Sequence, residues 1–152
     1  MRVCDRYCVG VLSLAGLVVS LNGCHSPQST SPSVSAALER YAHFAAAMAY
    51  DSVAALFTDK GELVTAGQPT ITGPAAILAH LQSFVGFRVL ANDLHADTTR
   101  AALDTAYQAG TFRQRVIVPS GDTVVAQGRF TIVWVRDPVS GWRIRRMATG
   151  PR

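Results

Sequence analysis

Cysteine is absent from the chain after Cys24, and lysine occurs there only once, at Lys60. Without cysteine, residues 25–152 can form neither a disulfide framework nor a zinc site built on thiolates. The most apolar run, residues 9–21, is 13 residues long, whereas a helix needs about 20 apolar residues to cross a bilayer. These shortages exclude a disulfide-stapled domain and a membrane-spanning helix.

Sequence motifs for nucleotide, metal and nucleophile chemistry are missing as well. The chain has no Walker loop, no G-x-G-x-x-G, no nucleophile elbow and no metal spacing of His and Cys. The expected mature chain carries 12 basic and 9 acidic side chains, and its densest basic cluster is Arg143, Arg145 and Arg146. In an alternating strand only the first two of these share a face. We therefore expect no cofactor, no metal and no nucleic-acid partner.

The N-terminal segment has the layout of an export signal. Two arginines precede the apolar run, small residues follow it, and this order predicts a secretory signal peptide over residues 1–23. Residues 21–24 (LNGC) resemble the bacterial lipoprotein lipobox, although the second position departs from the usual small residues. The resemblance implies a diacylated Cys24 and, with His25 after it, an outer-membrane position facing the periplasm in a two-membrane cell. A soluble secreted form is the alternative.

After the signal, composition divides the chain into a tether and one domain. Residues 24–35 hold the lipidated cysteine and an uncharged Ser/Pro-rich stretch that predicts a flexible tether. Residues 36–152 are apolar enough for a core and match the size of one domain.

The periodicity of apolar residues changes along this domain from helical to strand-like. We expect helices at about 34–49, 51–57 and 74–86. We expect strands at 62–65, 70–72, 87–98, 104–118, 123–136 and 142–149, the last ones joined as hairpins. Helices followed by an antiparallel meander predict an α+β fold with the helices on one sheet face.

Four segments in this order carry a family resemblance: LERYAHFAAAMAYDSVAALFTDKGELV, ITGPAAILAHL, DTAYQAG and GRFTIVWVRDPVSGWRIRRM. Together they span nearly the whole domain and resemble the nuclear transport factor 2-like superfamily, in its SnoaL-like and ketosteroid-isomerase-like branch. The resemblance implies a cone-shaped, curved antiparallel sheet with three N-terminal helices packed on its concave face around a mostly apolar pocket. It also implies a homodimer through the sheet as one use of the fold.

Strand register predicts which side chains face that pocket. If Ser120-Gly121 is a hairpin tip, Tyr107 lies opposite Trp134 and Thr111 opposite Phe130. Across the last hairpin the same counting places Ile132 opposite Arg146. The predicted inner face therefore consists of Tyr107, Thr111, Phe130, Ile132, Trp134 and Arg146, unless a bulge shifts part of it.

Arg146 is the one cation on this predicted inner face. A guanidinium there could clamp a ligand carboxylate or another anion, because it offers a planar fork of donors. It could equally form a structural ion pair with Glu62 or an aspartate, or extend to the rim.

The family resemblance adds two pocket residues, Tyr41 and Thr65. Tyr41 stands where ketosteroid isomerases have the tyrosine that stabilises an enolate. The position of their general base falls at Thr65, and that of their neutral acid near Arg129 or Phe130. Because neither position holds a carboxylate, steroid-type isomerisation is not expected and catalytic residues stay unassigned.

Asp93, His95 and Asp97 alternate along one strand and could form a proton-transfer or metal cluster. Leu90, Leu94 and Ala96 lie on the opposite face of that strand, which favours an outward position for the acidic residues and the histidine.

These observations predict an exported, lipid-anchored protein whose domain binds a small, partly apolar molecule, and they leave an anionic ligand open. One alternative is an isomerase or cyclase of the SnoaL-like type, and another is a structural module that dimerises through its sheet. An inward Asp93 or His95 would favour the enzyme, and an inward Arg146 would favour binding.

The anchor can be tested by one substitution. Cys24→Ser removes the thiol that would be acylated, so the variant should lose lipid labelling and leave the membrane fraction. Unchanged membrane association and electrophoretic mobility of Cys24→Ser would contradict the lipoprotein assignment.

Overall fold

The computed structural model describes residues 33–152. The predicted signal peptide, Cys24 and most of the tether lie outside these described residues. Ser31–Arg152 form a compact unit by themselves. Among the described residues, no helix is both long and apolar enough to cross a membrane.

The three helices lie close to the predicted ranges: α1 (Val34–Ala46), α2 (Tyr50–Ala55) and, after the first two strands, α3 (Pro74–Gln82). The side chain of Ser33 caps α1 by accepting a hydrogen bond from the Ala36 N–H at 3.1 Å. Val34 is buried, so the first two helical residues, assigned to the tether from sequence, already belong to the folded domain. Pro74 occupies the first turn of α3, where a backbone N–H has no acceptor within the helix, so proline costs no hydrogen bond there.

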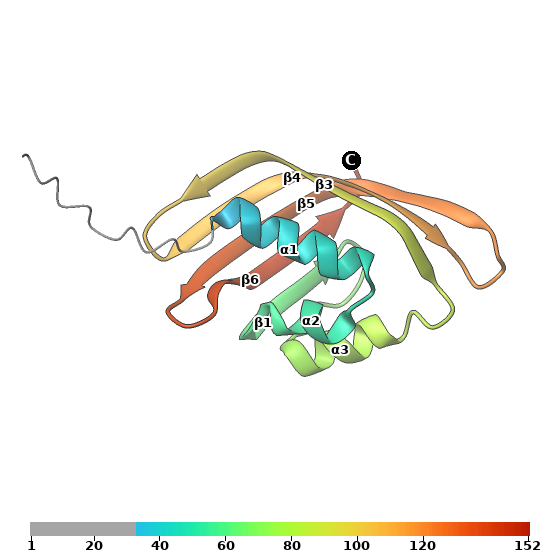
Figure 1. Cartoon of the computed structure of the whole chain (residues 1–152), viewed down its shortest axis with the longest axis horizontal. Helices are drawn as coiled ribbons and strands as arrows, with labels where there is room; N and C mark the ends of the chain where they lie inside the picture. The colour runs from blue at the N-terminus through green and yellow to red at the C-terminus, as the bar shows by residue number, and fades with distance from the viewer. Residues whose placement is uncertain (1–32) are drawn as a thin grey trace, which may run out of the picture. The chain divides into compact units, whose positions relative to one another are not determined.

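A six-stranded curved sheet completes the α+β fold that the sequence predicts. Its strands are β1 (Phe57–Thr65), β2 (Ile71–Thr72), β3 (Arg88–Ala101), β4 (Thr105–Ile117), β5 (Thr123–Asp137) and β6 (Gly141–Gly150). They lie in the order β2-β1-β6-β5-β4-β3, and the sheet arches over the helices without closing (Figure 1). One pairing differs from a purely antiparallel sheet, because β1 and β6 run parallel.

The core lies between the helices and the inner face of the sheet. The largest fully buried side chains include Phe57, Phe130, Ile132, Trp134 and Ile144 from the strands. Burying one aliphatic or aromatic side chain of this size contributes about 1.5–3 kcal/mol. Burial of these inward side chains therefore contributes much of the free energy that holds the helices against the sheet.

A buried polar group sits within this apolar layer. Gln108 is 1% exposed, accepts a hydrogen bond from the Trp134 indole N–H at 2.9 Å and donates one to the Thr99 hydroxyl at 3.2 Å. Both the amide and the indole would be costly to bury without partners. The pair fixes which way the Trp134 ring lies across the sheet.

The predicted register of the β4–β5 hairpin is wrong by one residue. The turn spans residues 118–122 and is closed by hydrogen bonds from the Val118 N–H to the Asp122 carbonyl and from the Gly121 N–H to the Val118 carbonyl. Gly121 has φ +93°, a conformation that favours glycine. Because the turn has an odd number of residues, the hairpin is centred on Ser120, and Ala106, rather than Tyr107, lies opposite Trp134. A one-residue shift turns every β4 side chain to the other face.

Consequently Tyr107 and Thr111 lie on the outer face of the sheet, and their predicted inward position is corrected. Tyr107 lies opposite Val133, and Thr111 lies opposite Arg129. Tyr107 is 39% exposed. Phe130 faces inward as predicted, but its partner on β4 is Gly110.

The β5–β6 hairpin contains a β-bulge, which the sequence analysis named as the feature that would shift part of the predicted inner face. Trp134 lies opposite Ile144 as predicted, but the register then shifts, and Ile132 lies opposite Met147. The extra residue turns Arg146 outward, opposite Val133 and next to Glu62 on β1, with which it forms an ion pair. Arg146 is thus a structural cation on the outer face, as the second of its two interpretations predicts.

The buried polar pair supports a test of stability. Gln108→Leu keeps most of the volume but leaves the Trp134 indole N–H without an acceptor, so the free energy of unfolding should fall by about 1–3 kcal/mol. Urea unfolding measures the loss. Adding Trp134→Phe removes the stranded donor, so the double variant should lose less than the two single variants combined.

Gln127→Leu is the matched control, because Gln127 is exposed on the same sheet. It should leave the free energy of unfolding within about 0.5 kcal/mol of the parent. Equal losses in Gln108→Leu and Gln127→Leu would contradict the assigned role of the Gln108 amide.

Candidate functional site

A cavity of about 400 Å³ lies between the helices and the inner face of the sheet. This volume falls within the range of about 300–1,000 Å³ that is usual for small-molecule sites. Its walls are mostly aliphatic, aromatic and thioether side chains. The lining residues are Tyr41, Ala45, Met48, Tyr50, Val53, Leu63, Thr65, His80, Leu81, Phe84, Phe87, Val89, Asn92, Leu94, Phe112, Gln114, Val116, Val124, Ala126, Phe130, Met147 and Thr149.

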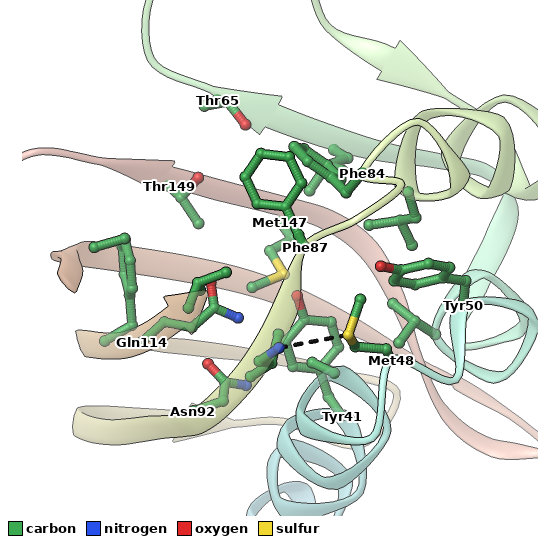
Figure 2. A pocket seen from close by; sticks show the side chains of 18 of the residues that line it. Tyr41, Met48, Tyr50, Thr65, Phe84, Phe87, Asn92, Gln114, Met147 and Thr149 are labelled. Atoms are coloured by element: carbon green, nitrogen blue, oxygen red, sulfur yellow. Dashed lines mark hydrogen bonds between the residues drawn. The ribbon is translucent and has the colours of Figure 1, made fainter. Parts of the chain in front are cut away.

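Four polar side chains from four elements extend into this cavity. Figure 2 shows Tyr41 of α1, Tyr50 beside it on α2, and Asn92 and Gln114 on the sheet wall. Asn92 and Gln114 are cross-strand neighbours on β3 and β4. The Asn92 amide also donates a long hydrogen bond, 3.5 Å, to the Ala42 carbonyl of α1. The two amides and two hydroxyls are therefore placed at fixed points on an apolar wall.

Burial changes the acidity of both tyrosines. Removal from water raises the pKa of Tyr41 to about 12 and raises that of Tyr50 as well. Burial has this effect because an apolar surrounding disfavours the phenolate. Among residues 33–152 the Tyr41 hydroxyl has no hydrogen-bond partner. Tyr41 thus offers a neutral O–H to whatever occupies the cavity.

Met48 reaches the cavity from an unusual backbone position. It follows the C-cap of α1 with φ +54°, the left-handed conformation that glycine or asparagine usually supplies there. For a methionine this conformation costs roughly 1 kcal/mol or more. Its sulfur accepts a hydrogen bond from the Val89 N–H at 3.5 Å (Figure 2). The contact links the α1–α2 connection to the start of β3 across the cavity wall.

Two threonines form a second polar point on the wall. Thr65 on β1 and Thr149 on β6 are neighbours in the parallel pair, and both line the cavity. Figure 2 shows them together on the side of the cavity formed by these two strands. The parallel pairing, which no local pattern signals, is what brings them together.

Aromatic rings from α3 and the following connection cover another side. The Phe84 ring packs edge-on against both His80 and Phe87, with ring centres 5.2 and 5.6 Å apart. His80 is the single imidazole among the described lining residues. It has no carboxylate beside it in the lining, so nothing there orients it as a general base.

Charge is absent from the described lining of the cavity. None of those residues is Asp, Glu, Lys or Arg. A buried charge without a counter-charge costs several kcal/mol. The described lining therefore offers no Asp, Glu, Lys or Arg as a counter-charge for an ion.

Of the eight predicted pocket residues, the structure brings three together. Tyr41, Thr65 and Phe130 line the cavity. Ile132 and Trp134 face the same way but are fully buried in the core beyond it. Tyr107, Thr111 and Arg146 lie on the outer face, for the register reasons given above.

The Asp93, His95 and Asp97 group faces outward, as the alternation of β3 predicts. All three side chains are exposed. His95 and Asp97 approach to 3.8 Å, and Arg129 also lies 3.8 Å from Asp97. Within the described part of the chain, no group of His, Cys, Asp and Glu could hold a metal ion.

Asn92 and Gln114 were missed from sequence, although one signal for them existed. The alternation that places Asp93 and His95 outward also places Asn92 inward with Leu94. With the hairpin centred on Ser120, the same reasoning turns Gln114 inward. Met48 and Tyr50 were missed as well, because the sequence predicted a helix through residue 49, whereas α1 ends at Ala46 and Tyr50 begins α2.

The arched sheet over three helices, with an apolar cavity between them, is the nuclear transport factor 2-like fold. The SnoaL-like domain model matches residues 32–148, so the chain belongs to the SnoaL-like domain family. No curated protein sequence matches it significantly.

Solved structures share this fold at low sequence identity. A ketosteroid isomerase-like protein from Erwinia carotovora atroseptica matches with a TM-score of 0.71 and 17% identity, over 81% of this chain and 96% of that one. A nuclear transport factor 2-like protein from Novosphingobium aromaticivorans gives 0.62 and 23%, over 76% and 77%. A protein from Catenulispora acidiphila, solved in complex with S-DNPA, gives 0.62 and 15%, over 77% and 89%.

The raised pKa of Tyr41 predicts a specific loss of stability in alkali. Between pH 10 and about 12 the unfolded chain releases this phenolic proton while the folded chain keeps it. The free energy of unfolding should therefore fall as the pH rises through this window, by about 2 kcal/mol from this group. Tyr41→Phe should lack that part of the fall in urea unfolding measured at successive pH values.

Tyr107→Phe is the matched control, because Tyr107 lies on the outer face. It should reproduce the parent's alkaline profile. If Tyr41→Phe and Tyr107→Phe behave alike, Tyr41 does not carry the shift.

Proposed function

We propose that the domain binds a neutral, largely apolar small molecule in this cavity and does not convert it chemically. The observation that carries the proposal is the cavity lining itself: about 400 Å³ enclosed by apolar walls with a few fixed hydrogen-bonding groups. This composition is typical of ligand sites, in which apolar contacts supply affinity and a few polar groups supply orientation. The Catenulispora acidiphila protein, which has the same fold, was solved in complex with S-DNPA.

The lack of charge argues for a neutral ligand. The sequence alone left an anionic ligand open because Arg146 was expected inside. Arg146 instead pairs with Glu62 on the outer face, and no described lining residue is Asp, Glu, Lys or Arg. An anion would have to leave water without a counter-charge, so the anionic alternative loses its support.

The polar groups argue for a ligand with at least one hydrogen-bond acceptor. The Tyr41 and Tyr50 hydroxyls and the Gln114 amide can all donate into the cavity. A carbonyl or ether oxygen would satisfy such a donor without carrying charge. A purely hydrocarbon ligand would leave these donors without an acceptor, which would lower the binding free energy by their desolvation cost.

Catalysis of the isomerase type lacks its reacting groups here. Proton transfer at carbon needs a base and an acid within hydrogen-bond reach of the substrate. Thr65 occupies the expected base position, and no carboxylate is found among the described residues around the cavity. Neither Asp93 nor His95 points inward to replace one.

For location, we propose an exported, lipid-anchored protein of the cell envelope. The support is the sequence before the domain: a charged start, an apolar run and the LNGC motif ending at Cys24. An acyl anchor would hold the pocket domain near a membrane on a short Ser/Pro tether.

A matched pair of probes tests the preference for a neutral ligand. Acetylnaphthalene and naphthoate share a ring system, but the first carries a neutral carbonyl and the second a carboxylate. Calorimetric titration should show the ketone binding at least about tenfold more tightly than the carboxylate. Equal or tighter binding of naphthoate would contradict the proposed neutral site.

A substitution that fills the cavity tests whether the ketone binds there. Ala45→Phe adds a ring on the face of α1 that lines the cavity, so it should abolish ketone binding. Ala46→Phe, on the exposed side of the same helix, should leave the affinity unchanged. If both variants bind the ketone like the parent, the probe occupies another site and the proposal fails.

A further inference from the structure

The exposed members of the cavity lining mark its mouth. Among the described lining residues only Phe84, Val124 and Ala126 are exposed. Phe84 belongs to the α3–β3 connection, and Val124 and Ala126 belong to the first half of β5. The cavity therefore opens between that connection and the β4–β5 hairpin, which projects at one end of the sheet (Figure 1).

Large apolar side chains are exposed near this mouth, on the α3–β3 connection and on the neighbouring end of the sheet. Five of the eight exposed large hydrophobic residues of the described chain gather here: Phe84, Val85, Leu90, Val124 and Val125, which we call the apolar rim. Val85 is 80% exposed and Val125 is 48% exposed. Such clustering marks an interaction site, whereas single exposed apolar residues are ordinary.

The register and one close contact bring these residues together. Val89, Val116 and Val124 form one row on the inner face across three strands, whereas Val125, opposite Arg115, points to the outer face of the same end of the sheet. The α3–β3 connection reaches the hairpin turn, because a Cβ on Gly86 would lie 3.4 Å from the Pro119 ring. The rim therefore extends from the α3–β3 connection to both faces of the sheet at the β4–β5 hairpin end.

Two arginines flank the rim without an acidic partner. Arg115 lies opposite Val125, and Arg88 lies opposite Ile117 at the start of β3. Both are exposed, and neither forms an ion pair with any residue between 33 and 152. The nearby Asp122 carboxylate accepts a hydrogen bond from the Ser120 hydroxyl. The rim thus combines exposed apolar side chains with free positive charge.

We propose that the apolar rim docks on a lipid surface with anionic headgroups, so that the cavity exchanges its ligand directly with the membrane. The inference rests on the proposed function, because an apolar, neutral ligand partitions into lipid rather than water. Exposed apolar side chains beside arginines are the combination that binds at the headgroup boundary of anionic membranes. The mouth opens at the same end of the sheet as these residues, so docking there brings the cavity next to the lipid in which an apolar ligand dissolves.

The experiment uses the domain without its anchor, residues 31–152, which form a compact unit by themselves. Flotation measures its binding to vesicles of phosphatidylcholine alone and of phosphatidylcholine mixed with phosphatidylglycerol. We expect binding to the mixed vesicles, weaker binding to the neutral ones, and a decrease with added salt. Absence of binding to both compositions overturns the proposal.

Matched substitutions locate the surface. Val85→Asp and Val125→Asp should each weaken vesicle binding by about tenfold. Val139→Asp should not, because Val139 is 95% exposed in the β5–β6 turn, outside the rim. Arg115→Gln should reduce binding to the mixed vesicles more than Arg100→Gln, a substitution of an exposed arginine far from the mouth. Equal losses in the rim variants and their controls overturn the proposal.

A second measurement separates this surface from the cavity. Val85→Asp should keep the parent's affinity for acetylnaphthalene in solution while losing vesicle binding. If the parent binds no ketone yet docks on vesicles through Val85, docking stands and the proposed ligand site fails. If Val85→Asp abolishes self-association of the parent in sedimentation, with no vesicle binding in either protein, the rim is a protein interface and the proposal is overturned.

Discussion

The turn at residues 118–122 determines the face on which every side chain of β4 and β5 lies. Its five residues, with Gly121 at φ +93°, centre the hairpin on Ser120. From that centre, alternation sends Gln108, Gln114 and Phe130 inward. A turn one residue shorter would face Tyr107 and the strand arginines towards the helices, where their charge could not be compensated. The apolar cavity therefore depends on a turn that contributes no side chain to it.

The bulge in β6 has the complementary effect on charge. By adding a residue between Ile144 and Met147, it turns both Arg145 and Arg146 outward while the strand continues to face the core. Arg146 then meets Glu62, and Arg145 donates to the Lys60 carbonyl. The sheet thus separates a charged outer face from an uncharged inner face within a strand of ten residues.

Element types and the α+β class could be predicted from sequence, because periodicity and turn residues act locally. The family follows from the same ordered segments and is confirmed by the domain match. The site could be predicted only in part. Tyr41 and Thr65 came from the resemblance, whereas Tyr107 and Arg146 failed on single-residue shifts that hydrophobic alternation cannot detect, since Tyr107 is apolar enough for either face. The β1–β6 pairing, and with it Thr149, joins segments about 85 residues apart, and no local pattern encodes such a contact.

That long-range pairing has a consequence for how the protein matures. β1 can pair with β6 only after residues 141–150 have been synthesised. Contacts between segments so far apart in the sequence form slowly, because closing the long loop between them costs conformational entropy before the contact forms. Met147 and Thr149 of β6 belong to the cavity wall. The cavity therefore does not exist in a nascent chain that lacks β6, and its wall is completed only when this last strand pairs with β1.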